Sequence, residues 1–435
     1  MIDGLRDHPL RGALNAEVHS RPFANLQAPE RISHLALLSG ERGAERDRQH
    51  VALLCERFAV AAPDAGENHF MADFGPFRLK WERHTEFSTY TFFQNGAVEA
   101  EPFAGFSVDL VPRDWLIALP GDLLVAVHLD LLDRSTPPPG TARLTRLFGH
   151  DNIVGSQVSG GSAEVWMDFT VQDDRFSRIL LRDTGLRSRQ AGRLVQRFLE
   201  IETYRMMALL AFPAAKRHGG VLAAAGERLT AITGRMTETD GIGAEQALLD
   251  ELMAFSSEIE DVAAATNYRF GAARAYYALV RSRVEELREQ RVEGLQTIEE
   301  FIDRRLAPAM RTCEAVSERL ETLSRRVARA SQLLLTRVDI QLEGQNRDLL
   351  KSMDRRAHLQ LRLQQTVEGL SVAAITYYLA SLVGYLAKAG KAAGLPVDAA
   401  IATGVSIPVI ALMIWLGVRR MRRVLAREEG ADGKH

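Results

Sequence analysis

Two uncharged apolar segments near the C-terminus constrain this chain more than any other feature. They run from Leu370 to Ala387, 18 residues, and from Ala399 to Val418, 20 residues. The hydrocarbon core of a bilayer, about 30 Å thick, needs about 20 helical residues to be crossed. The second segment is long enough, and the first is long enough if side chains at its ends snorkel or the bilayer thins. The pattern predicts transmembrane helices at 370–387 and 399–418, joined by a short loop at 388–398. The alternative is a buried helical hairpin in a large soluble core.

Basic residues around these segments predict their orientation. They are concentrated outside the hairpin, at Lys351, Arg355, Arg356 and Arg362 before it and at Arg419, Arg420, Arg422, Arg423 and Arg427 after it, whereas the loop has only Lys388 and Lys391. By the positive-inside rule both termini are cytoplasmic and the loop is external. The first residues contain no apolar run of a signal peptide, so we expect the bulk of the chain in the cytoplasm. The tail 419–435 is then a basic cytoplasmic anchor beside anionic lipid headgroups.

One stripe of the first apolar segment consists of small or polar residues. Tyr377, Ser381 and Gly384 share a helical face, and Lys388 follows on it. Such a stripe either packs against another helix or lines a pore. Neither segment contains Asp, Glu, Lys or Arg, so a proton relay has no obvious carrier there.

Composition and motifs exclude several classes of function. The 54 Lys and Arg nearly balance the 56 Asp and Glu, so nucleic-acid binding is not expected. Cys55 and Cys313 form no CxxC pair, which argues against a disulfide framework and a zinc site. The sequence has no phosphate loop, no GxGxxG opening a helix, no GxSxG and no HExxH. We therefore predict no enzymatic activity and no cofactor, and a metal-dependent enzyme is the least favoured interpretation.

Residues 1–187 alternate strand and helix signals, which predicts a cytoplasmic α+β or α/β domain around a mixed sheet. Strands are expected at 31–38, 77–93 and 122–132 and within 151–182, with a helix at 42–59. From Ser188 onward the chain is rich in Arg, Glu, Leu and Ala, which predicts a helical bundle at 188–307 and a stalk helix at 308–369.

The stalk carries a heptad-like seam after Pro308. Apolar residues recur at spacings of three and four at Cys313, Val316, Leu320, Leu323, Val327, Ala330 and Leu334. The seam then continues with extra steps of four at Val338, Leu342, the polar Gln345, Leu349 and Met353. The first part predicts a coiled coil, and the change of spacing is a stutter. We expect a homo-oligomer assembled through the stalk and the first apolar segment, with an intramolecular bundle as the alternative.

Two polar groups are candidate sites. Glu82, His84 and Glu86 alternate in one expected strand, so they share a face on which carboxylates and an imidazole can bind a divalent metal. A solvated sheet face predicts the same alternation without a metal. The second group places Asn15, Glu17, His19 and Arg21 within seven residues, either as an ordered turn or as a small-ligand site.

Three blocks carry a family resemblance: HPLRGALNAEVHSRPFANLQAPERISHLALL at 8–38, KWERHTEFSTYTF at 80–92 and RQAGRLVQRFLEIETYRMMALLA at 189–211. The chain resembles, over nearly its whole length, a bacterial family of membrane-anchored proteins known as a domain of unknown function. This resemblance implies a multi-pass protein of the bacterial inner membrane.

The order of the expected parts is also similar to that of the CorA-type magnesium channels, which are pentamers. That family marks the end of its first span with Gly-Met-Asn, whereas Gly384-Tyr385-Leu386 stands here. The resemblance implies a homo-oligomeric CorA-like ion channel of unknown selectivity. The alternative is a membrane-anchored scaffold whose cytoplasmic domain binds a protein partner.

Overall fold

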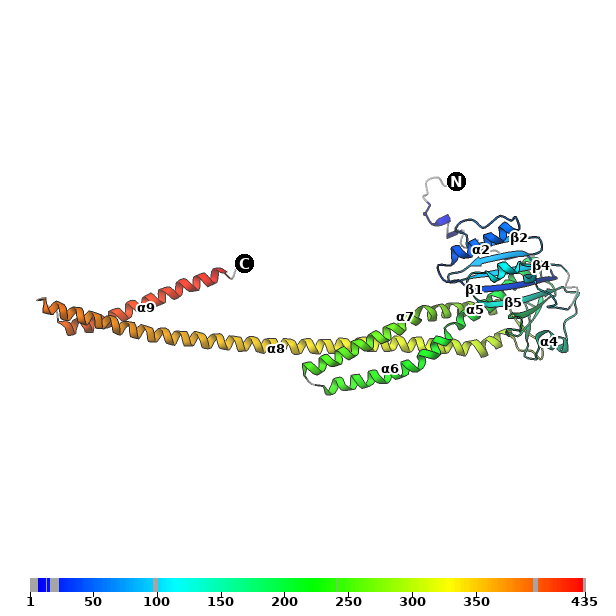
Figure 1. Ribbon diagram of the computed structural model, residues 1–435. Coiled ribbons are helices and arrows are strands. Elements are labelled where there is room, and N and C mark those ends of the chain that lie inside the picture. Colours follow the sequence, from blue (N-terminus) through cyan, green and yellow to red (C-terminus); the bar gives the residue numbers. More distant parts are fainter. Residues whose placement is uncertain are drawn as a thin grey trace. The chain divides into compact units, whose positions relative to one another are not determined.

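The structure, a computed structural model, describes residues 7–12, 14–15, 23–96, 101–239, 241–393 and 398–432 (Figure 1). The chain divides into two compact units. Unit 1 comprises Met1–Thr239 and Ala247–Gln332, and unit 2 comprises Asp240–Gln246 and Leu333–His435. Each unit is described by itself below.

Within its described residues, unit 1 contains a sheet of nine strands in the order β2-β3-β4-β1-β5-β8-β7-β6-β9. The strands are β1 (Glu30–Leu38), β2 (His69–Asp73), β3 (Arg78–Arg83), β4 (Phe87–Asn95), β5 (Asp122–Leu132), β6 (Val154–Val158), β7 (Ala163–Met167), β8 (Ser177–Asp183) and β9 (Gln290–Arg291). β5 and β8 pair in parallel, and the other neighbours are antiparallel. The predicted N-terminal domain with a mixed sheet is therefore confirmed.

Helices cover both faces of this sheet. On one face α2 (Ala44–Arg57) buries Val51 and Leu54 against Leu79 and Trp81 of β3. Farther along that face lies α4 (Thr141–Phe148), whose apolar residues contact Trp166. The opposite face packs against α5 (Ser188–Leu209), which begins at the predicted position.

Long helices follow α5, as the predicted helical bundle requires. α6 (Phe212–Glu238) has Pro213 in its first turn and contains Gly219 and Gly220. α7 (Ile242–Leu287) is one helix of 46 residues. Two short helices, η1 (Ser107–Leu110) and α3 (Arg113–Ile117), lie between β4 and β5.

α8 (Ile298–Ala392) begins ten residues before Pro308. The Thr297 hydroxyl accepts the backbone N–H of Glu300, and the Glu300 carboxylate accepts that of Thr297, so a capping box starts the helix here. Pro308 then lies inside the helix and not in its first turn.

The first seam residues of α8 are buried within unit 1. Val316 lies 3.6 Å from the position of a Cβ at Gly219 of α6, and Cys313 shares a small cavity with Phe270 of α7. The seam from Cys313 to Ala330 therefore packs in a bundle with earlier helices of the same chain. Farther along, Leu342, Leu349 and Met353 are exposed.

Unit 2 contains the rest of α8 and α9 (Ala399–Asp432). Among the described residues, α8 and α9 each contain a stretch that is long and apolar enough to cross a membrane by length and composition. Thr376, Ala380 and Ile410 are buried there, and a Cβ at Gly384 would lie 3.0 Å from Oγ1 of Thr403. α8 extends to Ala392, so Lys388 belongs to the helix and not to the expected loop.

Candidate functional site

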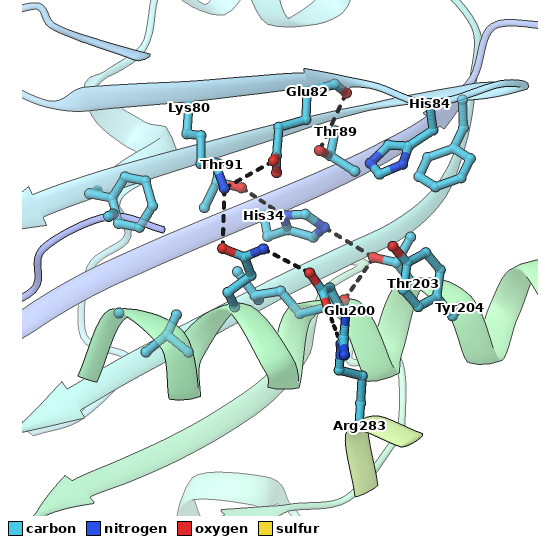
Figure 2. A pocket seen from close by; sticks show the side chains of 17 residues that line it. His34, Lys80, Glu82, His84, Thr89, Thr91, Glu200, Thr203, Tyr204 and Arg283 are labelled. Atoms are coloured by element: carbon cyan, nitrogen blue, oxygen red, sulfur yellow. Dashed lines mark hydrogen bonds and ion pairs between the residues drawn. The ribbon is translucent and has the colours of Figure 1, made fainter. Parts of the chain in front are cut away.

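A pocket of about 290 Å³ lies in unit 1 between the sheet and α5. Its floor comes from β1, β3 and β4, one wall comes from α5, and Arg283 of α7 lies at its edge. Figure 2 shows Lys80 and Glu82 on the same side of β3, directed toward the helix. Strand alternation explains this arrangement, because Leu79 before Lys80 and Trp81 after it point into the core under α2.

The floor is a polar row across three strands. Lys80 pairs with Thr91 in the register of β3 and β4, and Thr91 pairs with His34 in the register of β4 and β1. Two residue pairs along, and so on the same face, Glu82 lies opposite Thr89. Residues paired in register face the same side of a sheet, so these five side chains meet at one surface.

The His34 imidazole is locked in one neutral tautomer. The Thr203 hydroxyl donates its proton to the Leu199 carbonyl at 2.8 Å, so it accepts from Nε2–H of His34 at 3.1 Å. Nδ1 then accepts the Thr91 hydroxyl proton at 2.8 Å. Burial, with a smaller effect of the nearby Lys80 ammonium, lowers the pKa of His34 to about 3. His34 therefore fastens α5 to the sheet and is unavailable as a base or a metal ligand.

Charged groups of alternating sign line the pocket. Lys80 Nζ lies 3.0 Å from Oε1 of Glu82 and donates to Oε1 of Gln196 at 3.3 Å. The Gln196 amide donates to Glu200 at 2.7 Å, and Glu200 also accepts from the Arg283 guanidinium. The chain of contacts thus runs from a buried ion pair on the sheet to an ion pair between α5 and α7.

This chain of contacts leaves hydrogen-bonding capacity at its buried end. An ammonium has three N–H donors, and among the described residues the contacts of Lys80 Nζ are those to Glu82 and Gln196. Within the same part of the chain, the contact made by the Glu82 carboxylate is the one from Lys80 to Oε1. A donor and an acceptor of opposite charge therefore remain next to each other in the pocket.

The predicted metal trio is not assembled. β3 ends at Arg83, so Glu86 lies in the turn before β4 and the expected alternation fails. Glu82 pairs with Lys80, and the His84 ring stacks on Phe87 with centroids 4.2 Å apart. Glu86 accepts from both guanidinium nitrogens of Arg269, at 3.2 and 2.6 Å, and from the Tyr276 hydroxyl at 3.0 Å. Among the described residues, no group of three or more His, Cys, Asp and Glu side chains is arranged to hold a metal ion.

The described residues that line the pocket include none of the other predicted residues. Asn15 is described, whereas Glu17, His19 and Arg21 fall outside the described residues, as do the side chains of Arg422 and Arg423. On α9, the Arg419 guanidinium lies over the Trp415 ring at 5.0 Å, and Arg420 is exposed. In the expected stripe Tyr377 is exposed, Ser381 is half-buried and Gly384 contacts α9.

Sequence reasoning missed most of the pocket. His34 lies in the expected strand 31–38, and nothing in the sequence links it to Lys80 and Glu82 of another strand. Gln196, Glu200 and Thr203 have the spacing of one helical face, and only the fold brings that face to the sheet. The alternation of Lys80 with Glu82 was an available signal, but Arg283 is joined to the site only by the fold.

Comparisons with known proteins identify a family. The family described as "Protein of unknown function (DUF3422)" matches residues 6–425. No curated protein and no solved structure matches the chain, so the architectural resemblance to CorA-type channels has no support from these comparisons. Because the family match covers nearly the entire sequence, the chain belongs to the DUF3422 family.

Proposed function

We propose that this protein is anchored in the bacterial inner membrane by the apolar parts of α8 and α9, with both termini in the cytoplasm, and that unit 1 is a cytoplasmic binding module. The exposure of these helices is the main support for the anchoring. Their apolar stretches are 11% and 6% buried, whereas a core helix of a soluble protein would be mostly covered. The Lys and Arg asymmetry supports the orientation.

A binding function is favoured by the position of Gly384. The scaffold interpretation expects the small residues of the first apolar segment to pack against a neighbouring helix, and Gly384 does so against Thr403 of α9. Thr376 and Ala380 lie on this packed face as well. The pocket of unit 1, with its buried Lys80 and Glu82, gives the cytoplasmic part a place to bind.

Alkaline carbonate extraction of membranes from cells that express the full chain tests the anchoring. We expect the protein to stay in the membrane pellet, and a reporter fused to the C-terminus to be active in the cytoplasm. Release of the full-length chain into the supernatant would contradict the proposal, as would an external reporter.

A CorA-like ion channel is the second candidate, and Tyr377 is the observation that favours it. Its side chain is 70% exposed, so a central axis between several copies can be lined by this residue. Lys388 is also exposed and would place a ring of positive charge at the outer mouth, which disfavours divalent cations.

Ion flux into liposomes with reconstituted protein tests the channel. We expect weak cation selectivity or anion passage, and Lys388→Glu should shift the permeability toward cations. If neither the parent protein nor Lys388→Glu passes ions, the binding function is the better account.

A further inference from the structure

The charges that line the pocket between the sheet and α5 balance one another. Two cationic groups, Lys80 and Arg283, stand beside two carboxylates, Glu82 and Glu200, and His34 is neutral. A ligand with a net charge would therefore bring an uncompensated charge into a partly buried site, which is costly. A ligand without net charge fits the pocket best.

The unused groups of the pocket are themselves charged and of opposite sign. The side chains of Lys80 and Glu82 are 5% and 13% exposed, and each keeps capacity for a further hydrogen bond. Hydrogen bonds between ionised groups are shorter and stronger than those between neutral groups. An ammonium on the ligand suits Glu82, and a carboxylate suits Lys80.

Apolar side chains make up part of the remaining lining, beside the hydroxyls of Thr89, Thr91 and Thr203. Phe87 and Phe93 of β4 and Val195 and Leu199 of α5 all border the space, and each is at least nine-tenths buried. The volume of about 290 Å³ is at the lower end of the roughly 300–1,000 Å³ that small-molecule sites occupy. The space is suited to a metabolite with a compact apolar body.

We propose that this pocket binds a small zwitterion with an apolar body, of the kind represented by hydrophobic amino acids. Its ammonium donates to the Glu82 carboxylate, and its carboxylate accepts from the Lys80 ammonium. The apolar body lies against Phe87, Phe93, Val195 and Leu199. The proposal rests on the proposed role of unit 1 as a binding module and names the class of ligand.

The test is calorimetric titration of the detergent-solubilised full-length protein with four probes that share one body. L-Phenylalanine is the zwitterion, 2-phenylethylamine has only the ammonium, 3-phenylpropionate has only the carboxylate, and N-acetylphenylalaninamide has neither. We expect L-phenylalanine to bind at least about tenfold more tightly than each of the other three, which corresponds to about one charge-assisted hydrogen bond.

Glu82→Gln is the decisive variant, and Glu164→Gln is its matched control. Glu164 is also a strand glutamate of this sheet, 18% exposed and 2.9 Å from Arg182, but it lies outside the pocket. In Glu82→Gln the Lys80 charge loses its partner, so the affinity for L-phenylalanine should fall about tenfold or more while that for 3-phenylpropionate rises. Glu164→Gln should leave both affinities within about twofold. A general structural effect of losing a largely buried carboxylate would appear in both variants, whereas the loss of a ligand contact appears only in Glu82→Gln.

The binding of 3-phenylpropionate by Glu82→Gln shows that this variant is folded, and a third variant tests the location of the site. Val195→Phe fills the pocket without changing its charge, so it should abolish the binding of L-phenylalanine. The proposal is overturned if the four probes bind equally or if the two Gln variants behave alike. It is also overturned if no probe binds the parent protein at about 10 mM, which corresponds to a binding free energy of less than about 3 kcal/mol. Carbonate extraction reports on membrane anchoring separately, so a failure of either proposal is recognised by itself.

Discussion

Two buried histidines of unit 1 are held neutral by their surroundings. Burial lowers the pKa of both His34 and His128 to about 3. The His128 ring is stacked between Phe106 and Phe176, at centroid distances of 3.6 and 3.8 Å, and its Nδ1 lies 2.9 Å from the Ser33 hydroxyl. Protonation of either ring would therefore place a positive charge in a buried position beside the sheet.

These histidines make the stability of unit 1 dependent on pH. The folded pKa of His34 lies below its ordinary value of 6.5, so its contribution is complete above pH 6.5 and is lost as the pH falls toward 3. We expect the free energy of unfolding to decrease, from this residue, by up to about 1.4 kcal/mol per pH unit below 6.5. His34→Gln should make this decrease shallower in urea unfolding followed by tryptophan fluorescence. The control His358→Gln changes an exposed histidine and should leave the slope as it is.

Asp130 predicts the opposite dependence. Its side chain is buried and accepts the Phe103 backbone N–H at 2.8 Å, and burial raises its pKa to about 6. The protonated form is favoured in the folded state, so this contribution is lost as the pH rises through 6. Asp130→Asn mimics that form and should raise the free energy of unfolding at pH 7.5 by roughly 1–3 kcal/mol. The gain should vanish near pH 4; an equal gain at both pH values would contradict this account.

Among the elements, the contact between α8 and α9 in unit 2 depends on a glycine, which has no side chain. A Cβ at Gly384 would lie 3.0 Å from Thr403 Oγ1, whereas a Cβ at Gly404 would have no atom within 4 Å. We expect Gly384→Val to destabilise the hairpin by about 1–3 kcal/mol through overpacking. Gly404→Val is the matched control and should be tolerated. Thermal melting in detergent, followed by circular dichroism, measures both; equal melting points would show that this contact is unimportant.

The strands differ in how well the sequence predicts them. β1 and β5 are long apolar runs between turn residues, so their positions follow from local pattern. β2 was missed because its residues are only partly buried at the sheet edge, and β9 because its two residues are strand only through their pairing with β6.

The pocket was missed for a similar reason. Glu200 and Arg283 are 83 positions apart in sequence and are joined only by packing of α5 and α7.

At the scale of the whole molecule, the exposed part of α8 predicts association with further copies of the chain. Its residues before 332 pack within unit 1, but the seam continues to exposed Leu349 and Met353. Since apolar side chains at this spacing are typical of helices that pair, a second copy is the expected partner. We expect mass measurement in detergent to give an oligomer of the full-length protein.

Leu349→Lys should dissociate this oligomer, because it places a charge in the seam. Leu53→Lys is the matched control, since Leu53 of α2 is similarly exposed, at 59% against 61%, but lies outside the seam. A monomer for the parent protein at micromolar concentration would refute the prediction, as would equal dissociation by both variants.

The position of β9 in the chain has a consequence for the order of synthesis. The outer edge of β6 is paired by Gln290 and Arg291, and Leu287 and Gln296 add backbone hydrogen bonds on either side. Leu287 is the last residue of α7 and the others follow it, about a hundred positions after β8 ends at Asp183. At roughly 5–20 residues per second, a ribosome needs on the order of 5–20 s to make that interval. During this time the edge of β6 is open to pairing with any other nascent chain, so the sheet is protected only after α5, α6 and α7 have left the ribosome.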